Sequence, residues 1–375
     1  MYNNTTGFNN VVMGYNSLYY NTVGKYNTAL GTISMHLNTS GDNNTAAGYA
    51  ALYDNTTGVG NAAYGFCSLV NNTIGHFNVS IGCQALFSNI TGGCNVAIGA
   101  AALCANNCTG FSTAVGHETL RMSITGANNT AVGFRALCKV NALGNTAVGT
   151  SALRNATAGT YNEAFGVNAL FNNTNGCQNV AIGTHALYAN TTANNNTAVG
   201  NNALRSNTTG AYNTGVGLYA GCNNTTGDCT VSLGYAAGRY LANGTTALET
   251  AENSTYIGTC TRGAASDDNN VTVIGYLAKA CGDNTVSIGN SDVTNTFLQG
   301  TTRSDNISAT GSLSATGTGW NVFGGKVGIS NSSTEFDLDS TDNEAGLHIK
   351  STGDVALILE ADTDNVGESD NPKIK

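Results

Sequence analysis

Short apolar segments recur along the chain at a fixed interval, and each of them ends in a glycine. A typical segment is Asn129-Thr130-Ala131-Val132-Gly133, in which a small residue lies between two β-branched ones. The closing glycine recurs at 14, 31, 48, 65, 82, 99, 116, 133, 149, 166, 183, 200, 217 and 234. Each step is 17 residues, except for a 16-residue step from 133 to 149. A short and constant repeat is typical of a solenoid, in which every repeat forms one coil.

Each position in a coil can be counted from the closing glycine. Positions −3 to −1 hold Thr or Val, then a small residue, then a larger apolar residue, and this alternation predicts a short strand. The glycine provides the backbone angles of the bend that ends the strand. A leucine usually follows at +4, and a polar turn such as 55–58 (Asn-Thr-Thr-Gly) comes after it. The pattern therefore predicts an all-β fold, a parallel β-solenoid (β-roll or β-helix) with 17-residue coils over roughly residues 7–300.

An asparagine precedes the strand at position −4 of nearly every coil. Stacked coils place equivalent residues about 4.8 Å apart, so we expect these side-chain amides to form a hydrogen-bonded ladder along the solenoid axis. We interpret this column as structural and not as a binding site. The ladder residues are Asn95, Asn129, Asn145, Asn162, Asn179 and Asn196.

The small residues at position −2 suggest how chains associate. We interpret positions −3, −1 and +4 as the core, which leaves position −2 on the opposite face of the strand. Such a strip of small side chains permits close approach of another chain, and closed symmetry hides it, so we expect a parallel homotrimer. The expected intersubunit residues are Ala97, Ala114, Ala131, Ala147, Ala181 and Ala198. The rod ends, with repeat sequence starting directly after Met1, are candidates for end-to-end assembly into a fibre.

The regularity of the repeat defines three regions. Residues 1–238 are predicted to form the regular 17-residue-repeat solenoid, and residues 239–300 irregular solenoid coils, where segments such as Val273-Ile274-Gly275 return after an interruption. Residues 301–375 differ in composition and contain a continuous apolar run at 355–359, which predicts a β-rich C-terminal fibre segment.

Composition and charge narrow the class of protein. Charged residues make up 10 % of the 375 residues, and alanine is the commonest of the hydrophobic residues, which make up 41 %, so a thin core one coil wide is expected. The net charge of −9 comes without a basic stripe, which argues against nucleic acid as a partner. The sequence holds no transmembrane run, so we expect no membrane span.

Residues that carry chemistry are sparse and scattered. The acids Asp54, Glu118 and Glu163 do not share a column, so they predict no carboxylate pair of the kind that cleaves glycosidic bonds. The 11 cysteines form no metal-type pairs, and we interpret them as small buried filler. A disulfide between neighbouring coils, as for Cys67 and Cys83, is the alternative. We expect no catalytic, cofactor-binding or metal-binding residues, and no enzyme.

Two segments resemble known repeats. At Asn95-Val96-Ala97-Ile98-Gly99 and at 284–290 (Asn-Thr-Val-Ser-Ile-Gly-Asn) the chain resembles the head repeats of trimeric autotransporter adhesins, which form a left-handed parallel β-roll in a homotrimer. The longer unit, with Asn-Ala-Leu and Asn-Thr-Thr-Gly, is similar to repeats of phage and virus tail-fibre proteins. The different period and the lack of a recognisable stalk or membrane anchor favour the viral fibre.

The resemblance implies a structural fibre protein of a virion that displays a host-attachment surface. Its location would be extracellular, and its receptor a host surface glycan or protein. The alternative is a bacterial cell-surface trimeric adhesin or an extracellular filament-forming protein. An ice-binding or other surface-binding solenoid would need outward threonine arrays. We interpret the threonine column at −3, interrupted by Val79, Val96 and Val180, as an inward face that disfavours this rival.

Overall fold

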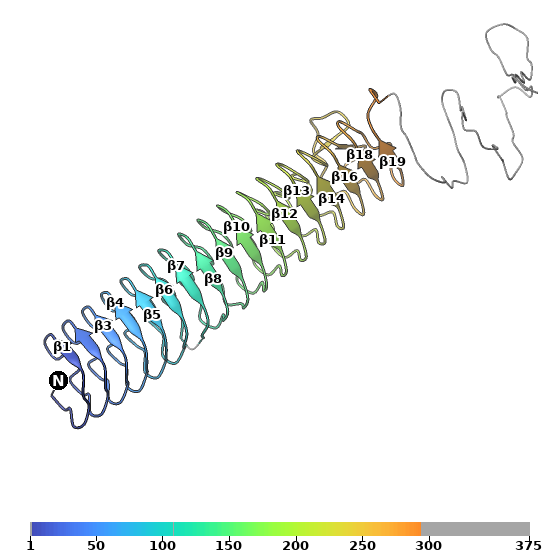
Figure 1. Cartoon of the computed structure of the whole chain (residues 1–375). Helices are drawn as coiled ribbons and strands as arrows, with labels where there is room; N and C mark the ends of the chain where they lie inside the picture. The colour runs from blue at the N-terminus through green and yellow to red at the C-terminus, as the bar shows by residue number, and fades with distance from the viewer. Residues whose placement is uncertain (1, 108, 294–375) are drawn as a thin grey trace, which may run out of the picture. The chain divides into compact units, whose positions relative to one another are not determined.

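The computed structural model describes residues 2–107 and 109–293, and these form a parallel β-solenoid of about 16 turns (Figure 1). The predicted fold class is therefore confirmed, with coils of about 17 residues and no helix among the described residues. The predicted C-terminal fibre segment, 301–375, lies outside the described residues.

Each coil contributes one strand of three residues to a single 17-stranded parallel sheet, which runs along one side of the solenoid. The strands of this sheet are β1 (Val11–Met13), β2 (Thr28–Leu30), β3 (Thr45–Ala47), β4 (Ala62–Tyr64), β5 (Val79–Ile81), β6 (Val96–Ile98), β7 (Thr113–Val115), β8 (Thr130–Val132), β9 (Thr146–Val148), β10 (Glu163–Phe165), β11 (Val180–Ile182), β12 (Thr197–Val199), β13 (Thr214–Val216), β14 (Val231–Leu233), β16 (Thr255–Ile257), β18 (Thr272–Ile274) and β19 (Val286–Ile288). A second sheet has two short strands, β15 (Tyr240–Leu241) and β17 (Arg262–Gly263).

Residues one repeat apart pair directly across the sheet, as Ala97 does with Ala114. The closing glycines stack in one column, where a Cβ added to Gly99 would lie 2.4 Å from the carbonyl oxygen of Gly116. Gly99 also has a φ of 133°, so both the space and the backbone angle require glycine at this bend. The 16-residue coil keeps the register, since its missing residue comes out of the turn between Val140 and Gly144.

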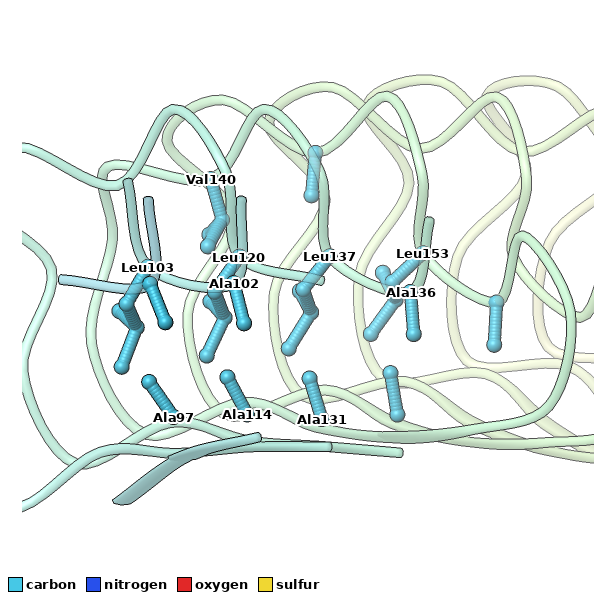
Figure 2. Close-up of a cluster of buried hydrophobic side chains, with 14 of the residues drawn as sticks. Ala97, Ala102, Leu103, Ala114, Leu120, Ala131, Ala136, Leu137, Val140 and Leu153 are labelled. Atoms are coloured by element: carbon cyan, nitrogen blue, oxygen red, sulfur yellow. The ribbon is translucent and has the colours of Figure 1, made fainter. Parts of the chain in front are cut away.

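The interior of the coil is one layer of side chains thick. Ala114 and Ala131 project from the sheet toward Leu120 and Leu137, which project from the opposite wall (Figure 2). All four side chains are fully buried within the single chain. The alanines at −2 and the leucines at +4, together with buried alanines at +3 such as Ala102 and Ala136, therefore make up the core.

The predicted placement of the alanines on an outer face between subunits is wrong. Ala97, Ala114, Ala131, Ala147, Ala181 and Ala198 each have 0 % of their surface exposed and belong to the core of one chain. The facing leucine fills most of the space between the walls, so position −2 holds small side chains, alanine in most coils and serine at Ser80. Because successive residues of a strand point to opposite faces, positions −3 and −1 point outward instead.

The asparagines at −4 connect each coil to the next. Asn129 accepts a hydrogen bond at its Oδ1 from the backbone N–H of Asn145 (2.9 Å), and its Nδ2 donates to the carbonyl oxygen of Ala142 (2.8 Å). The contacts thus run mainly between side chain and backbone, with amide-to-amide contacts added in some coils, as from Asn162 Nδ2 to Asn145 Oδ1 (3.1 Å). All six predicted ladder residues are fully buried. In the coil after that of Asn95, Ser112 occupies position −4 in place of asparagine, and its Oγ accepts a hydrogen bond from the Asn129 backbone N–H.

A second asparagine ladder, which we did not predict, follows position +7. Asn38 Nδ2 donates to Asn21 Oδ1 (2.8 Å) and to the Gly41 carbonyl oxygen (3.1 Å). Its buried members are Asn21, Asn38, Asn55, Asn72, Asn89, Asn106, Asn173, Asn190, Asn207 and Asn224. Ser123, Val140 and Ala156 interrupt this second ladder, and all three are buried.

The irregular region contains a wider coil. The step from Gly234 to Gly258 is 24 residues, and Tyr256 occupies the inward −2 position in place of alanine. The Tyr256 ring occupies the space that a leucine at +4 fills in the regular coils. Position +4 is Gly238 here, and a Cβ on Gly238 would lie 2.9 Å from the ring. The buried Tyr256 hydroxyl donates to Asp268 (2.9 Å), and burial, reinforced by the Asp268 carboxylate, raises the pKa of Tyr256 well above its usual range.

We expect Asn129→Leu to destabilise the solenoid by about 1–3 kcal/mol, because the Asn145 N–H and the Ala142 carbonyl would be left buried without partners. Asn128→Gly is the matched control: Asn128 is exposed, and its φ of 57° suits glycine. Thermal unfolding of the two variants beside the wild type measures the difference, and equal shifts would refute the role of the ladder.

We expect Ala131→Val to destabilise the chain by about 1–3 kcal/mol through overpacking against Leu137. Thr130→Val, one residue earlier on the same strand but on the outer face, should change stability by less than about 0.5 kcal/mol. Denaturant unfolding of both variants tests the assignment of the faces. If Ala131→Val leaves stability unchanged, the assignment of the −2 alanines to the inner face is contradicted.

Candidate interaction surfaces

The outer face of the 17-stranded sheet carries a long row of apolar side chains at −1 beside a row at −3 in which threonine is the commonest residue. We call it the outer strip; it consists of positions −3 and −1 of the strands β1–β14, β16, β18 and β19. Apolar side chains at −1 are half-buried or exposed, with 37 % of Ile98, 38 % of Phe165 and 42 % of Ile182 accessible. In a soluble chain, an apolar surface that continues from strand to strand indicates contact with another molecule.

The outer strip is continuous because the strands pair in register. Ile81 lies beside Ile98, and Phe165 lies beside Ile182. The −1 positions of β4 to β18 are all apolar: Tyr64, Ile81, Ile98, Val115, Val132, Val148, Phe165, Ile182, Val199, Val216, Leu233, Ile257 and Ile274. Across the described strands of this sheet, Glu163 is the one charged residue at the −3 and −1 positions.

Exposed aromatic side chains border the outer strip on both sides. At position −5, before the strand, Phe111 is 70 % and Tyr212 is 62 % exposed. At position +1, after the glycine, Phe66 is 52 % and Tyr276 is 63 % exposed. These rings widen the apolar surface beyond the three-residue strands.

The area of the outer strip matches a stable protein interface. Strands about 4.8 Å apart make a strip on the order of 80 Å long, and three residues per strand make it about 10 Å wide. The product, about 800 Å², equals what one partner contributes to an interface of standard size.

The threonine column at −3 lies on the same outer face, so its interpretation as an inward face is wrong. Thr113, Thr130 and Thr146 follow one another in register, and Glu163 ends the run. Val79, Val96 and Val180 interrupt this outward column, so it does not form the unbroken threonine array that a surface-binding solenoid needs.

The acids of the regular coils lie apart from one another. Glu118 forms ion pairs with Arg121 and Arg135, and the hydrogen bond from Arg135 holds the pKa of the Glu118 carboxyl below its usual range. Glu163 lies on the outer strip, and partial burial raises the pKa of the Asp54 carboxyl. Among the described residues, no group of three His, Cys, Asp or Glu side chains is arranged to hold a metal ion.

The ten described cysteines are free thiols, so Cys67 and Cys83 are not joined by a disulfide. Their interpretation as buried filler holds for Cys138 and Cys222 but is wrong for four others, which lie on outward positions. The exposed cysteines are Cys83, Cys94, Cys229 and Cys281. Burial raises the pKa of the Cys138 and Cys222 thiols, which lowers their thiolate fraction near neutral pH.

Comparison of the chain with protein-family models, with curated proteins and with solved structures gives no match. Over the described part of the chain, no helix has the length and apolar character needed to cross a membrane.

The burial of the thiols predicts two classes of reactivity. At about pH 8, below the ordinary thiol pKa of about 8.5, a maleimide should modify Cys83, Cys94, Cys229 and Cys281 quickly and leave Cys138 and Cys222 unmodified. Peptide mass spectrometry over a time course reads out each site, and the same reaction in denaturant is the control. Rapid modification of Cys138 in the folded protein would contradict the assigned core.

Proposed function

We propose that this protein is a structural, non-enzymatic fibre protein of a virion that displays a host-attachment surface outside the cell. The observation that carries the proposal is the outer strip, an apolar surface that follows a rod-like solenoid with a single charge, Glu163, on it. A solenoid with this surface is suited to bundling side by side with copies of itself into a stiff fibre.

The outer strip, and not the alanine column, is the proposed contact in a parallel homotrimer. Three flat strips that meet around one axis bury their apolar residues and leave no strip free, so the assembly stops at three chains. Parallel chains in register place identical residues at the same height. Rows of Val, Ile and Phe then pack against equivalent rows, as in the core of an obligate oligomer.

The remaining sides of each coil carry polar turns and stay available to a receptor, a host surface glycan or protein. The alternative is a bacterial cell-surface trimeric adhesin or an extracellular filament, which needs the same trimeric rod. Antibody-labelled electron microscopy of the source particles separates the two, because it places the rod on a virion or on a cell envelope.

We expect the double variant Ile98→Lys, Ile182→Lys to be a folded monomer, while the wild type has three times the mass of one chain. Two lysines on the outer strip place charges where the proposed interface excludes water, which costs several kcal/mol of association energy. Thr57→Lys with Thr192→Lys, on exposed turns, is the matched control and should remain trimeric. Light scattering gives the masses and circular dichroism the fold; a monomeric or dimeric wild type would contradict the proposed trimer.

The attachment role predicts binding without turnover. The full-length protein should adhere to host cells and to a subset of immobilised host glycans or surface proteins, and bound glycans should be recovered at their original length. Chromatography of the glycans after long incubation detects any cleavage. Measurable hydrolysis would refute the non-enzymatic assignment, and failure to adhere to any host surface would refute the attachment role.

A further inference from the structure

The place where the repeat is broken contains a cavity. The 24-residue step between Gly234 and Gly258 inserts seven residues relative to a 17-residue coil (24 − 17 = 7). Strand β15 (Tyr240–Leu241) lies in this insertion and pairs with β17 (Arg262–Gly263) in the next coil, as a two-stranded sheet separate from the long one. In repeat proteins, insertions of this kind form loops that are often used for binding.

Two arginines and two tyrosines line the cavity. Its volume is about 140 Å³, and its lining includes Tyr235, Arg239, Tyr240, Thr261 and Arg262. Drug-sized ligands occupy about 300–1,000 Å³, so this cavity admits a single ring or one terminal group of a larger molecule. We call it the Arg239–Arg262 pocket.

No carboxylate in the part of the chain that the structure describes forms an ion pair with the guanidinium groups of the pocket. Both ion pairs among the described residues use Glu118, and neither includes Arg239 or Arg262. The Nε of Arg239 is buried and has no hydrogen-bond partner among the described residues. Arg262 donates from Nη1 to the Ala242 carbonyl oxygen (3.2 Å), which leaves other N–H groups of its planar fork for an anion.

The arginines are held in place before any ligand arrives. The guanidinium carbon of Arg239 lies 4.2 Å from the centre of the Tyr219 ring and 4.7 Å from that of Tyr240. Arg262 also borders a second cavity, of about 370 Å³, which is lined by Lys279 and by one acid, Asp292. Positively charged side chains therefore line both cavities, and Asp292 is the one carboxylate among the described residues that line them.

The mixture of groups selects a kind of ligand. A guanidinium fork binds a carboxylate through two parallel hydrogen bonds. Tyr235, which is 48 % exposed, presents a flat apolar ring with a polar tip, a surface that suits the C–H face and the hydroxyls of a sugar. A small, partly aromatic and positively charged pocket thus fits one carboxylate-bearing sugar residue.

We propose that the Arg239–Arg262 pocket binds the carboxylate-bearing residue of an acidic saccharide. This inference rests on the proposed attachment function and names the chemistry of the receptor. The regular coils provide the rod, and the insertion provides the recognition site.

The test compares full-length wild type with Arg239→Gln and Arg262→Gln on immobilised sialylated and uronate-containing oligosaccharides. Each variant should bind about tenfold more weakly or worse, as expected for the loss of a hydrogen bond to a charged group. Arg205→Gln is the matched control, because Arg205 is exposed, occupies the same +5 position as Arg239, and does not line the pocket. Should a glutamine variant fail to fold, Tyr235→Ala tests the same pocket through its partly exposed ring.

The ligand arms separate carboxylate from other chemistry. The same oligosaccharides with their carboxylates reduced to alcohols should not be retained, and added salt should weaken binding of the acidic forms. Four outcomes would each overturn the proposed binding of a carboxylate-bearing sugar. Two concern the ligand: equal binding of reduced and acidic forms, or preference for sulfated sugars without carboxylates. Two concern the protein: equal binding by wild type and both arginine variants, or no saccharide binding by wild type. Host-cell attachment, measured in parallel, is the separate readout of the proposed function: if attachment persists while the pocket fails, the fibre assignment stands.

Discussion

Hydrogen bonding between each coil and the next is the constraint on which the rest of this structure depends. The Gly133 N–H donates to the Val115 carbonyl oxygen one coil below, and the Gly149 N–H donates to Val132 in the same way, both at 2.8 Å. Because buried backbone groups need such partners, every residue of a strand must lie over the residue one repeat away. The two asparagine ladders extend the same rule to side chains. A coil that loses a residue therefore loses it in a turn, as between Val140 and Gly144, and never in a strand.

This constraint explains why the fold was predictable from the sequence and why the two faces of the strand were not. A repeat that must stack on itself preserves its length, so the glycine interval alone predicted the solenoid. Alternation at Thr130, Ala131 and Val132 indicates that neighbours point to opposite sides, but it does not say which side is inside. The leucine on the opposite wall decides that: with Leu137 inside, the thin cross-section has room for Ala131 and none for Val132.

Other features of the structure differ in whether the sequence contains a signal for them. The sequence does contain a signal for the second ladder, since the asparagine of the Asn-Thr-Thr-Gly turn recurs at the same interval as the asparagine at −4. The sequence contains no signal for the backbone conformation of the +4 leucines. Leu120 and Leu137 adopt φ values of 50° and 49°, a region that bulky residues rarely occupy on their own. Stacking and burial impose this conformation in coil after coil, so residue preference does not reveal it. The Arg239–Arg262 pocket was also out of reach, because the residues that line it meet only through the insertion.

The regular and irregular coils differ in the surfaces that they present. The regular coils provide a surface that is nearly the same at every height, which suits contact with an identical chain. The wide coil, where Tyr256 replaces alanine and Gly238 replaces leucine, provides an arrangement of side chains that the regular repeat does not produce.

The in-register stacking of the glycine column has a consequence for the length of the rod. Each coil contacts only the coils directly before and after it, so no contact between distant coils fixes the number of coils. Gain or loss of one whole 17-residue unit would move the two ends of the rod by about 4.8 Å and leave every cross-section unchanged. Recombination between near-identical repeats in the gene would make such changes in single steps. The length of the solenoid can therefore evolve independently of the shape of its cross-section.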